Sequence, residues 1–111
     1  MHVEVSTDTR TTADIGGVTA TVESRLSRYK ERLTRVEVHL SDVNGPKGGR
    51  DCRCALEARR AGRQPVAVTS EAHTTDDAVK GALEKMSSLL TTVFDREDNV
   101  KGGPSASGLP T

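Results

Sequence analysis

Two stretches of strict alternation limit what this chain can fold into. In residues 34–42 the apolar side chains Val36, Val38 and Leu40 alternate with polar or charged ones. Residues 51–60 repeat the pattern, with an apolar side made of Cys52, Cys54, Leu56 and Ala58. Successive side chains of a strand point to opposite faces of a sheet, so each stretch predicts a strand with one covered and one solvated face. Other elements of the chain must cover the apolar face.

Two further segments have the apolar spacing of amphipathic helices. In residues 14–33, apolar side chains recur every three or four positions: Ile15, Val18, Val22, Leu26, Tyr29 and Leu33. In residues 74–95, the apolar side is made of Val79, Ala82, Leu83, Met86, Leu90, Val93 and Phe94. Thr74 suits the N-cap of the second helix, and Asp76 and Asp77 suit the positive end of its dipole. Each predicted helix has one apolar side with which to cover the sheet.

Residues 2–6 and 64–70 also alternate, and they predict a first and a fourth strand. Ala61, Gly62 and Arg63 form a short connection that predicts a hairpin between the third and fourth strands. The order strand, helix, three strands, helix predicts an α+β domain of β-α-β-β-β-α topology. We expect a four-stranded mixed sheet with both helices on one face, the first strand lying parallel to the second and the others forming an antiparallel meander.

The chain length of 111 residues predicts a single folded domain, which we place at residues 1–96. From residue 97 the chain is polar and then rich in Gly, Pro and Ser, so residues 97–111 are predicted to form a flexible C-terminal tail. The apolar runs are too short for a signal peptide or a membrane span, and two cysteines are too few for a disulfide scaffold. We therefore expect a cytoplasmic protein that contacts no membrane.

The charges of the chain are unevenly distributed. The formal net charge is zero, with 16 basic and 16 acidic side chains. Residues 25–63, however, hold eleven Lys or Arg against five Asp or Glu, whereas residues 71–98 hold three against seven. Such segregation gives a local positive field even though the total vanishes. The basic centre of the chain is the part that predicts an anionic partner.

The residues of this basic centre also carry a family resemblance. Residues 33–40 read LTRVEVHL and are followed by Asp42 and the loop NGPKGG at residues 44–49. Residues 52–59 read CRCALEAR, and residues 66–68 and 78–79 add VAV and AV. With these motifs the chain resembles the hibernation-promoting factors and ribosome-associated translation inhibitors, most strongly across residues 28–82. Long members of the family carry a second, dimerising domain, which residues 97–111 are too few to form, so we expect a short form of the family.

The resemblance implies a fold related to double-stranded-RNA-binding domains and a function without catalysis. It implies binding to the small ribosomal subunit and its rRNA where mRNA and tRNA pass, which inhibits translation or promotes ribosome hibernation in stressed cells. Basic side chains on the helices and adjoining loops would contact the RNA. The implied protein is not an enzyme, uses no cofactor and no small-molecule substrate, and is a monomer away from the ribosome.

The first set of candidate RNA-binding residues lies in the first predicted helix. Arg25, Arg28 and Arg32 are spaced to share one helical face, and Lys30 lies between them. Guanidinium groups spaced in this way can contact successive phosphates and hold each one through two hydrogen bonds. The alternative interpretation is an ordinary solvated face, with basic residues placed near the negative end of the helix dipole.

The second set lies in the loops, the hairpin and the second helix. Its members are Lys47, Arg50, Arg53, Arg59, Arg60, Lys80 and Lys85, with Arg63 nearby. A glycine-rich loop that carries Lys and Arg can bring backbone amides and positive charge to one phosphate. The alternative interpretation is that Arg53 and Arg59 pair with Glu57 and Glu37 across the outer sheet face.

Metal binding and a different binding function are the remaining hypotheses. Cys52 and Cys54 are predicted to face the core while His39 faces solvent, so they do not converge on a metal. The alternative function is a protein–protein interaction or regulatory module, such as a homodimer, that keeps the fold but not ribosome binding. An exposed apolar patch on the outer sheet face would favour that alternative.

Overall fold

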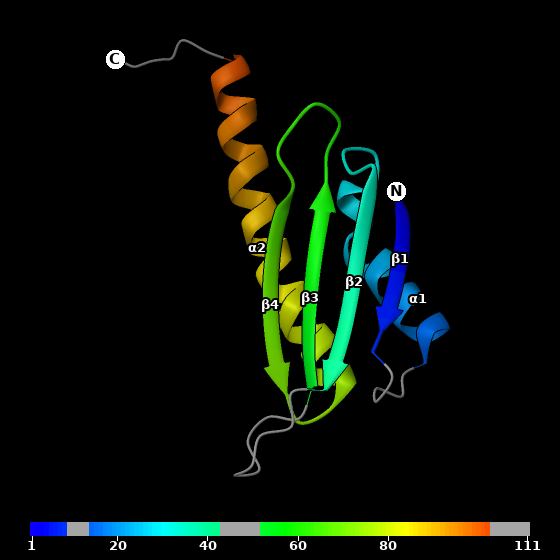
Figure 1. The fold of residues 1–111 in the computed structure, drawn as a ribbon. Coiled ribbons are helices and arrows are strands. Elements are labelled where there is room, and N and C mark those ends of the chain that lie inside the picture. The colour runs from blue at the N-terminus through cyan, green and yellow to red at the C-terminus, as the bar shows by residue number, and fades with distance from the viewer. Residues whose placement is uncertain (9–13, 43–51, 103–111) are drawn as a thin grey trace.

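The computed structural model describes residues 1–8, 14–42 and 52–102, and its elements follow the predicted order (Figure 1). They are β1 (His2–Thr7), α1 (Ile15–Arg25), the 3-10 helix η1 (Ser27–Tyr29), β2 (Arg35–Asp42), β3 (Cys52–Arg59), β4 (Val66–Ala72) and α2 (Thr75–Gly102). The prediction of a β-α-β-β-β-α fold is confirmed.

The four strands form one mixed sheet in the order β1-β2-β3-β4. β1 runs parallel to β2, with Val3 opposite Val36, and the other neighbouring pairs are antiparallel. At the turn between β3 and β4, Gly62 has a φ of 69°, a left-handed conformation that glycine adopts without steric cost. The predicted parallel pair, meander and hairpin are therefore all confirmed.

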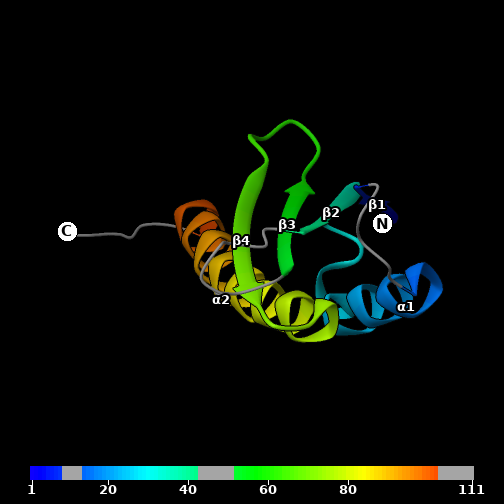
Figure 2. The same cartoon turned by 60° about the horizontal axis from the view of Figure 1, so that its bottom comes forward.

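Both helices cover the same face of the sheet, and the core lies between them and the strands (Figure 2). Alternate residues of the strands point into this layer, as the period of two requires. The most deeply buried large side chains come from both helical segments and from the sheet. They are Val22 and Leu26 of the first helical segment, Val36, Val38, Cys54 and Leu56 of the sheet, and Val79, Leu83, Met86 and Leu90 of α2.

The first helix is shorter than the sequence predicted. α1 ends at Arg25, and Leu26 follows with a φ of −105° and a ψ of 14°, outside the α-helical region. The chain continues as the tighter η1, which lets Leu26, Tyr29 and Leu33 all stay buried while the chain turns toward β2. The prediction that Arg25, Arg28 and Arg32 share one face of a continuous helix is therefore wrong. Ile15 belongs to the predicted apolar side of this helix, yet it is 47% exposed.

The second helix is longer than the sequence predicted. α2 continues to Gly102, so the predicted domain boundary at residue 96 falls inside it. Its polar end is held by ion pairs, because Glu97 contacts Arg60 and Asp98 contacts Arg32. Residues 97–102, which the sequence predicts to begin a flexible tail, lie in α2, whereas residues 103–111 lie outside the described part of the chain.

Candidate nucleic-acid interface

The sheet face opposite the helices carries arginines, and each of them is paired with a carboxylate. Arg53 contacts Glu71 at 2.7 Å, and Arg59 contacts Glu57 at 3.2 Å and Glu37 at 3.8 Å. The alternative interpretation of Arg59 is therefore confirmed, whereas Arg53 pairs with Glu71 instead of the predicted glutamates. The positive charge of this face is balanced at short range.

Glu37 is the centre of this network. It accepts a hydrogen bond from Arg35 Nε at 2.8 Å and lies 3.5 Å from the ring of His39. The hydrogen bond from Arg35 lowers the pKa of Glu37 below its usual range, and the nearby charge of Arg59 acts in the same direction. Arg35 lies directly opposite Arg59 on the neighbouring strand, which places two positive charges side by side. The carboxylate of Glu37 contacts both arginines and so offsets their repulsion.

The two candidate lysines of α2 are also engaged, each by a different partner. Lys80 contacts Asp76 one turn earlier at 3.0 Å. Lys85 donates a hydrogen bond to the carbonyl of Thr69 at 2.7 Å, which places its ammonium group at the free edge of β4. Lys80 is thus held within α2, and Lys85 is held by β4.

Three of the predicted residues remain exposed between α1 and β2. Arg25 is the last residue of α1, Arg28 lies in η1, and Lys30 follows it. Among the described residues, no carboxylate forms an ion pair with any of these three. Arg28 lies against the ring of Tyr29, with its Cζ 5.2 Å from the ring centroid, while Tyr29 itself is packed in the core. We call these three residues the cationic segment.

A second group of arginines converges where the β3–β4 turn meets the end of α2. Arg32, Arg60 and Arg63 line a shallow pocket of about 240 Å³ together with Phe94 and the carboxylates of Glu31 and Glu97. Glu97 Oε2 lies 2.7 Å from Arg60 and 3.6 Å from Arg63. We call Arg32, Arg60 and Arg63 the arginine cluster.

The aromatic ring of Phe94 organises the arginine cluster. The Cζ of Arg32 lies 3.9 Å from the ring centroid, and that of Arg60 lies 5.8 Å from it. Guanidinium groups are attracted to the face of an aromatic ring while their edges stay available for hydrogen bonds. Phe94 therefore holds two cations in place without consuming their donors.

The acidic half of this arrangement is not among the site residues predicted from the sequence. Glu97 and Asp98 were assigned to the tail, although they follow Phe94 by three and four positions and so lie on its side of a continuing helix. That spacing was the available signal. The structure brings the predicted site residues Arg32 and Arg60 together, and Arg63 lies beside them. Lys47 and Arg50 lie outside the described residues, and their predicted role stays a prediction.

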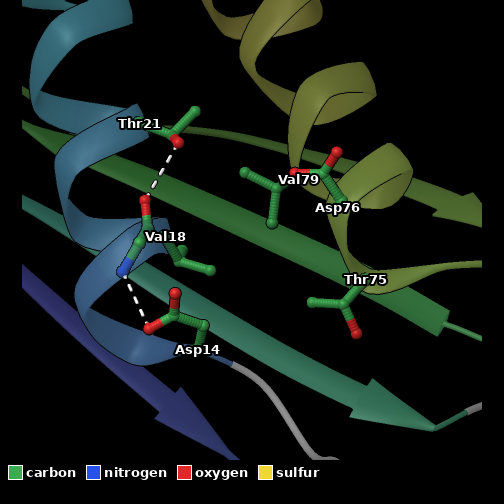
Figure 3. A pocket seen from close by; sticks show the side chains of 7 residues that line it. Asp14, Val18, Thr21, Thr75, Asp76 and Val79 are labelled. Atoms are coloured by element: carbon green, nitrogen blue, oxygen red, sulfur yellow. Dashed lines mark hydrogen bonds between the residues drawn. The ribbon is translucent and has the colours of Figure 1, made fainter.

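A further pocket, of about 280 Å³, lies between the first turns of α1 and α2 (Figure 3). Val18 and Val79 line it together with polar groups of Asp14, Thr21, Thr75 and Asp76. Asp14 accepts a hydrogen bond from the Gly17 amide at 3.1 Å, which caps α1, and Thr21 donates to the Gly17 carbonyl at 2.9 Å. Among the described residues, those that line this pocket include no basic side chain, so they do not extend the candidate interface.

Cys54 is fully buried, whereas Cys52 is partly buried and its sulfur lies 3.6 Å from the Thr75 hydroxyl. Burial raises the pKa of the Cys54 thiol to about 12. In the described part of the chain, no group of three or more His, Cys, Asp or Glu side chains is arranged to hold a metal ion. None of the helices described is both long and apolar enough to cross a bilayer.

The outer sheet face lacks the feature that would favour the alternative binding function. Within residues 1–8, 14–42 and 52–102, the exposed large hydrophobic side chain is Ile15, which belongs to α1 and not to the sheet. The outer face is instead covered by the ion pairs centred on Glu37. The observation that would have favoured a protein–protein module is therefore not found on this face.

The fold defines a class of small α+β domains with two helices on one face of a mixed four-stranded sheet. The solved structures that share it include the following two. One is the N-terminal domain of Protein Y from Thermus thermophilus, with a TM-score of 0.66 and 19% identity, covering 84% of this chain and 99% of that one. The other is a ribosomal subunit interface protein from Coxiella burnetii, with a TM-score of 0.65 and 13% identity, covering 86% and 99%.

These likenesses establish the shared fold. They agree with the fold that the sequence resemblance to hibernation-promoting factors implied. No protein-family model matches the chain, and no curated protein matches its sequence.

Proposed function

We propose that this protein is a ribosome-associated factor that binds the rRNA of the small ribosomal subunit and inhibits translation or promotes ribosome hibernation. The observation that carries the proposal is the likeness of nearly the whole domain to a protein described as a ribosomal subunit interface protein. The motifs of residues 33–40 and 52–59 support the same family independently.

The cationic segment supplies the RNA contact in this proposal. Arg25, Arg28 and Lys30 are exposed and carry no ion pair within the described residues, so their charges are available to a phosphate backbone. Arg35, Arg53, Arg59 and Lys80 are each held by a carboxylate, so they are weaker candidates. Contact with rRNA is therefore expected at the junction of α1 and β2.

The mechanism requires no catalysis. A rigid domain of this size, attached by its basic segment, would occupy the path of mRNA and tRNA and exclude them sterically. The protein would act in the cytoplasm. It would act as a monomer, since the proposed contact uses one segment of one chain. Phosphate contacts release counterions, so binding should weaken steeply as salt rises.

Sedimentation with ribosomes tests the proposal. Purified protein is mixed with isolated small subunits, large subunits or whole ribosomes and run on sucrose gradients at low and high salt. We expect migration with small subunits and whole ribosomes at low salt, and release at high salt. Protein that stays at the top of every gradient would overturn the proposal. A cell-free translation assay then shows whether bound protein lowers synthesis of a reporter.

A further inference from the structure

The polar end of α2 lies on the arginine cluster. Asp98 binds Arg32 through two hydrogen bonds of 3.1 Å, and Glu97 contacts both Arg60 and Arg63. The hydrogen bond from Arg60 lowers the pKa of Glu97 below its usual range, so the carboxylate is charged at neutral pH. Two carboxylates thus occupy the positions that anionic ligand groups would take on three arginines.

The helix itself does not favour these carboxylates at this place. The C-terminal end of an α-helix carries partial negative charge, and acidic side chains in its last turns are unfavourable. Glu97 and Asp98 lie in the last turns of α2, which ends at Gly102. Their placement is therefore stabilised by the arginine cluster, and loss of those contacts would free the end of the helix.

The carboxylates satisfy the cluster only in part. The side chain of Arg60 is 9% exposed, with one nitrogen on Glu97 at 2.7 Å and another on the Gln64 carbonyl at 3.0 Å. Its Nε is buried with no acceptor among the described residues. A buried donor without a partner is costly. A phosphate group offers more acceptor oxygens than one carboxylate, so it can satisfy more of the cluster's donors.

The Asp98 half of the cover is held loosely, whereas the Glu97–Arg60 pair is mostly buried, with side-chain exposures of 20% and 9%. Asp98 and Arg32 are about half exposed, with side-chain exposures of 56% and 40%, and ion pairs at such exposure contribute little to stability. The last turns of helices open at low free-energy cost. The pocket beside the cluster, about 240 Å³, has room for a phosphate group and several waters.

We propose that the arginine cluster is a second binding site for an RNA phosphate, and that Glu97 and Asp98 cover it in the free protein and are displaced when RNA binds. That rRNA is the biological ligand of this site rests on the proposed function. Binding of a phosphate backbone by the arginine cluster can be tested without it. In the covered state the protein has one basic surface, the cationic segment. In the uncovered state the arginine cluster adds a second basic surface.

The test compares variants in their affinity for RNA. Fluorescence anisotropy measures binding to a labelled RNA duplex of about 16 base pairs, a length that spans two minor grooves. The double variant Glu97→Gln/Asp98→Asn removes the competing carboxylates and should bind about fivefold to tenfold more tightly than wild type. Its affinity should also depend more steeply on salt, because additional phosphates are contacted.

A matched control separates uncovering from a general change of charge. Glu84→Gln/Asp95→Asn removes the same charge from exposed positions of the same helix, outside the arginine cluster. This variant should change the affinity by about twofold or less, since screened charges act weakly at a distance. Adding Arg32→Gln and Arg63→Gln to the uncovered variant should return the affinity to the wild-type value or below. Circular dichroism checks that every variant keeps its helix content.

The outcomes distinguish this inference from the proposed function. Equal affinity of wild type and Glu97→Gln/Asp98→Asn for the duplex would overturn the inference, as would an equal gain in the Glu84→Gln/Asp95→Asn control. Absence of duplex binding by the uncovered variant would overturn it too. If the uncovered variant gains affinity for the duplex as expected but no variant sediments with ribosomes, the second site stands and the proposed function fails.

Discussion

Arg32 and Asp98 form a bidentate ion pair in which both nitrogen–oxygen distances are 3.1 Å. The two residues are 66 positions apart in the sequence. The guanidinium of Arg32 also lies over the ring of Phe94, 3.9 Å from its centroid. A planar guanidinium can make both contacts because its edge donates hydrogen bonds while its face stacks. This pair therefore attaches the end of α2 to the segment that precedes β2.

A double-mutant cycle should detect this pair. Arg32→Gln and Asp98→Asn, singly and together, are expected to give a coupling energy of about 0.5–1 kcal/mol in urea unfolding at low salt, because bidentate geometry raises an exposed pair to the upper end of its range. The coupling should shrink as NaCl is added. The single-contact pair of Lys80 and Asp76 provides a matched cycle with a smaller expected value. A coupling of zero for Arg32 and Asp98 would mean that the pair does not hold the end of α2.

Gly81 should resist a substitution that ordinarily stabilises helices. A Cβ atom at Gly81 would collide with the hydroxyl of Ser70 on β4, where α2 packs closely on the sheet. Gly81→Ala is therefore expected to lower the melting temperature, although alanine has the higher helix propensity by about 1 kcal/mol. In a Ser70→Ala background the collision with the hydroxyl is gone, and the same substitution should be less damaging or stabilising. An equal effect in both backgrounds, measured by thermal unfolding, would contradict the close packing.

Stability should fall at acidic pH, with Glu97 contributing to the loss. Its pKa is lowered in the folded protein, chiefly by the hydrogen bond from Arg60, relative to the ordinary value of a glutamate in an unfolded chain. A lowered folded-state pKa stabilises the fold above the unfolded value, and this contribution is lost as the pH falls through the folded value. Thermal unfolding between neutral and strongly acidic pH should show a flatter profile for Glu97→Gln than for wild type. Parallel profiles would show that the hydrogen bond does not influence folding.

The two cysteines should differ sharply in reactivity. Burial raises the pKa of Cys54 to about 12, so almost none of it is thiolate at neutral pH, and its sulfur is inaccessible. Cys52 is only partly buried. Brief treatment with iodoacetamide at mildly alkaline pH should therefore alkylate Cys52 alone, as read by peptide mass spectrometry, and urea should expose Cys54. Simultaneous labelling of both thiols in native buffer would argue against the buried position of Cys54.

The cationic segment should matter more for ribosome binding than the paired basic residues. Arg25→Gln, Arg28→Gln and Lys30→Gln together are expected to weaken binding to small subunits by about tenfold or more and to reduce its salt dependence. The matched triple variant Arg53→Gln, Arg59→Gln and Lys80→Gln removes the same charge from residues already held by carboxylates. It should weaken binding much less. The reverse order of affinities, measured by pelleting with subunits, would move the interface to these paired basic residues.

The strands and their pairing could be predicted because their signal is local. Val36, Val38 and Leu40 alternate with polar residues, and the buried set in the structure is the same one. The short connection at Gly62 likewise determined the hairpin, because its length leaves few other paths. The helix ends were less predictable. The apolar spacing of Leu26, Tyr29 and Leu33 fits an α-helix or a 3-10 turn, and the route of the chain into β2 decides between them.

The sequence by itself therefore determined the element types, the topology and the two-layer arrangement, because periodicity states which side of each element must be buried. It also identified the basic centre of the chain. Only the tertiary structure decided which basic residues remain free. Arg59 and Arg60 are neighbours in the sequence, yet one pairs with Glu57 and Glu37 on the outer face and the other with Glu97 at the end of α2. Ion pairing between segments that are distant in the sequence depends on where the fold places both partners. No local sequence pattern specifies the distance between the two side chains.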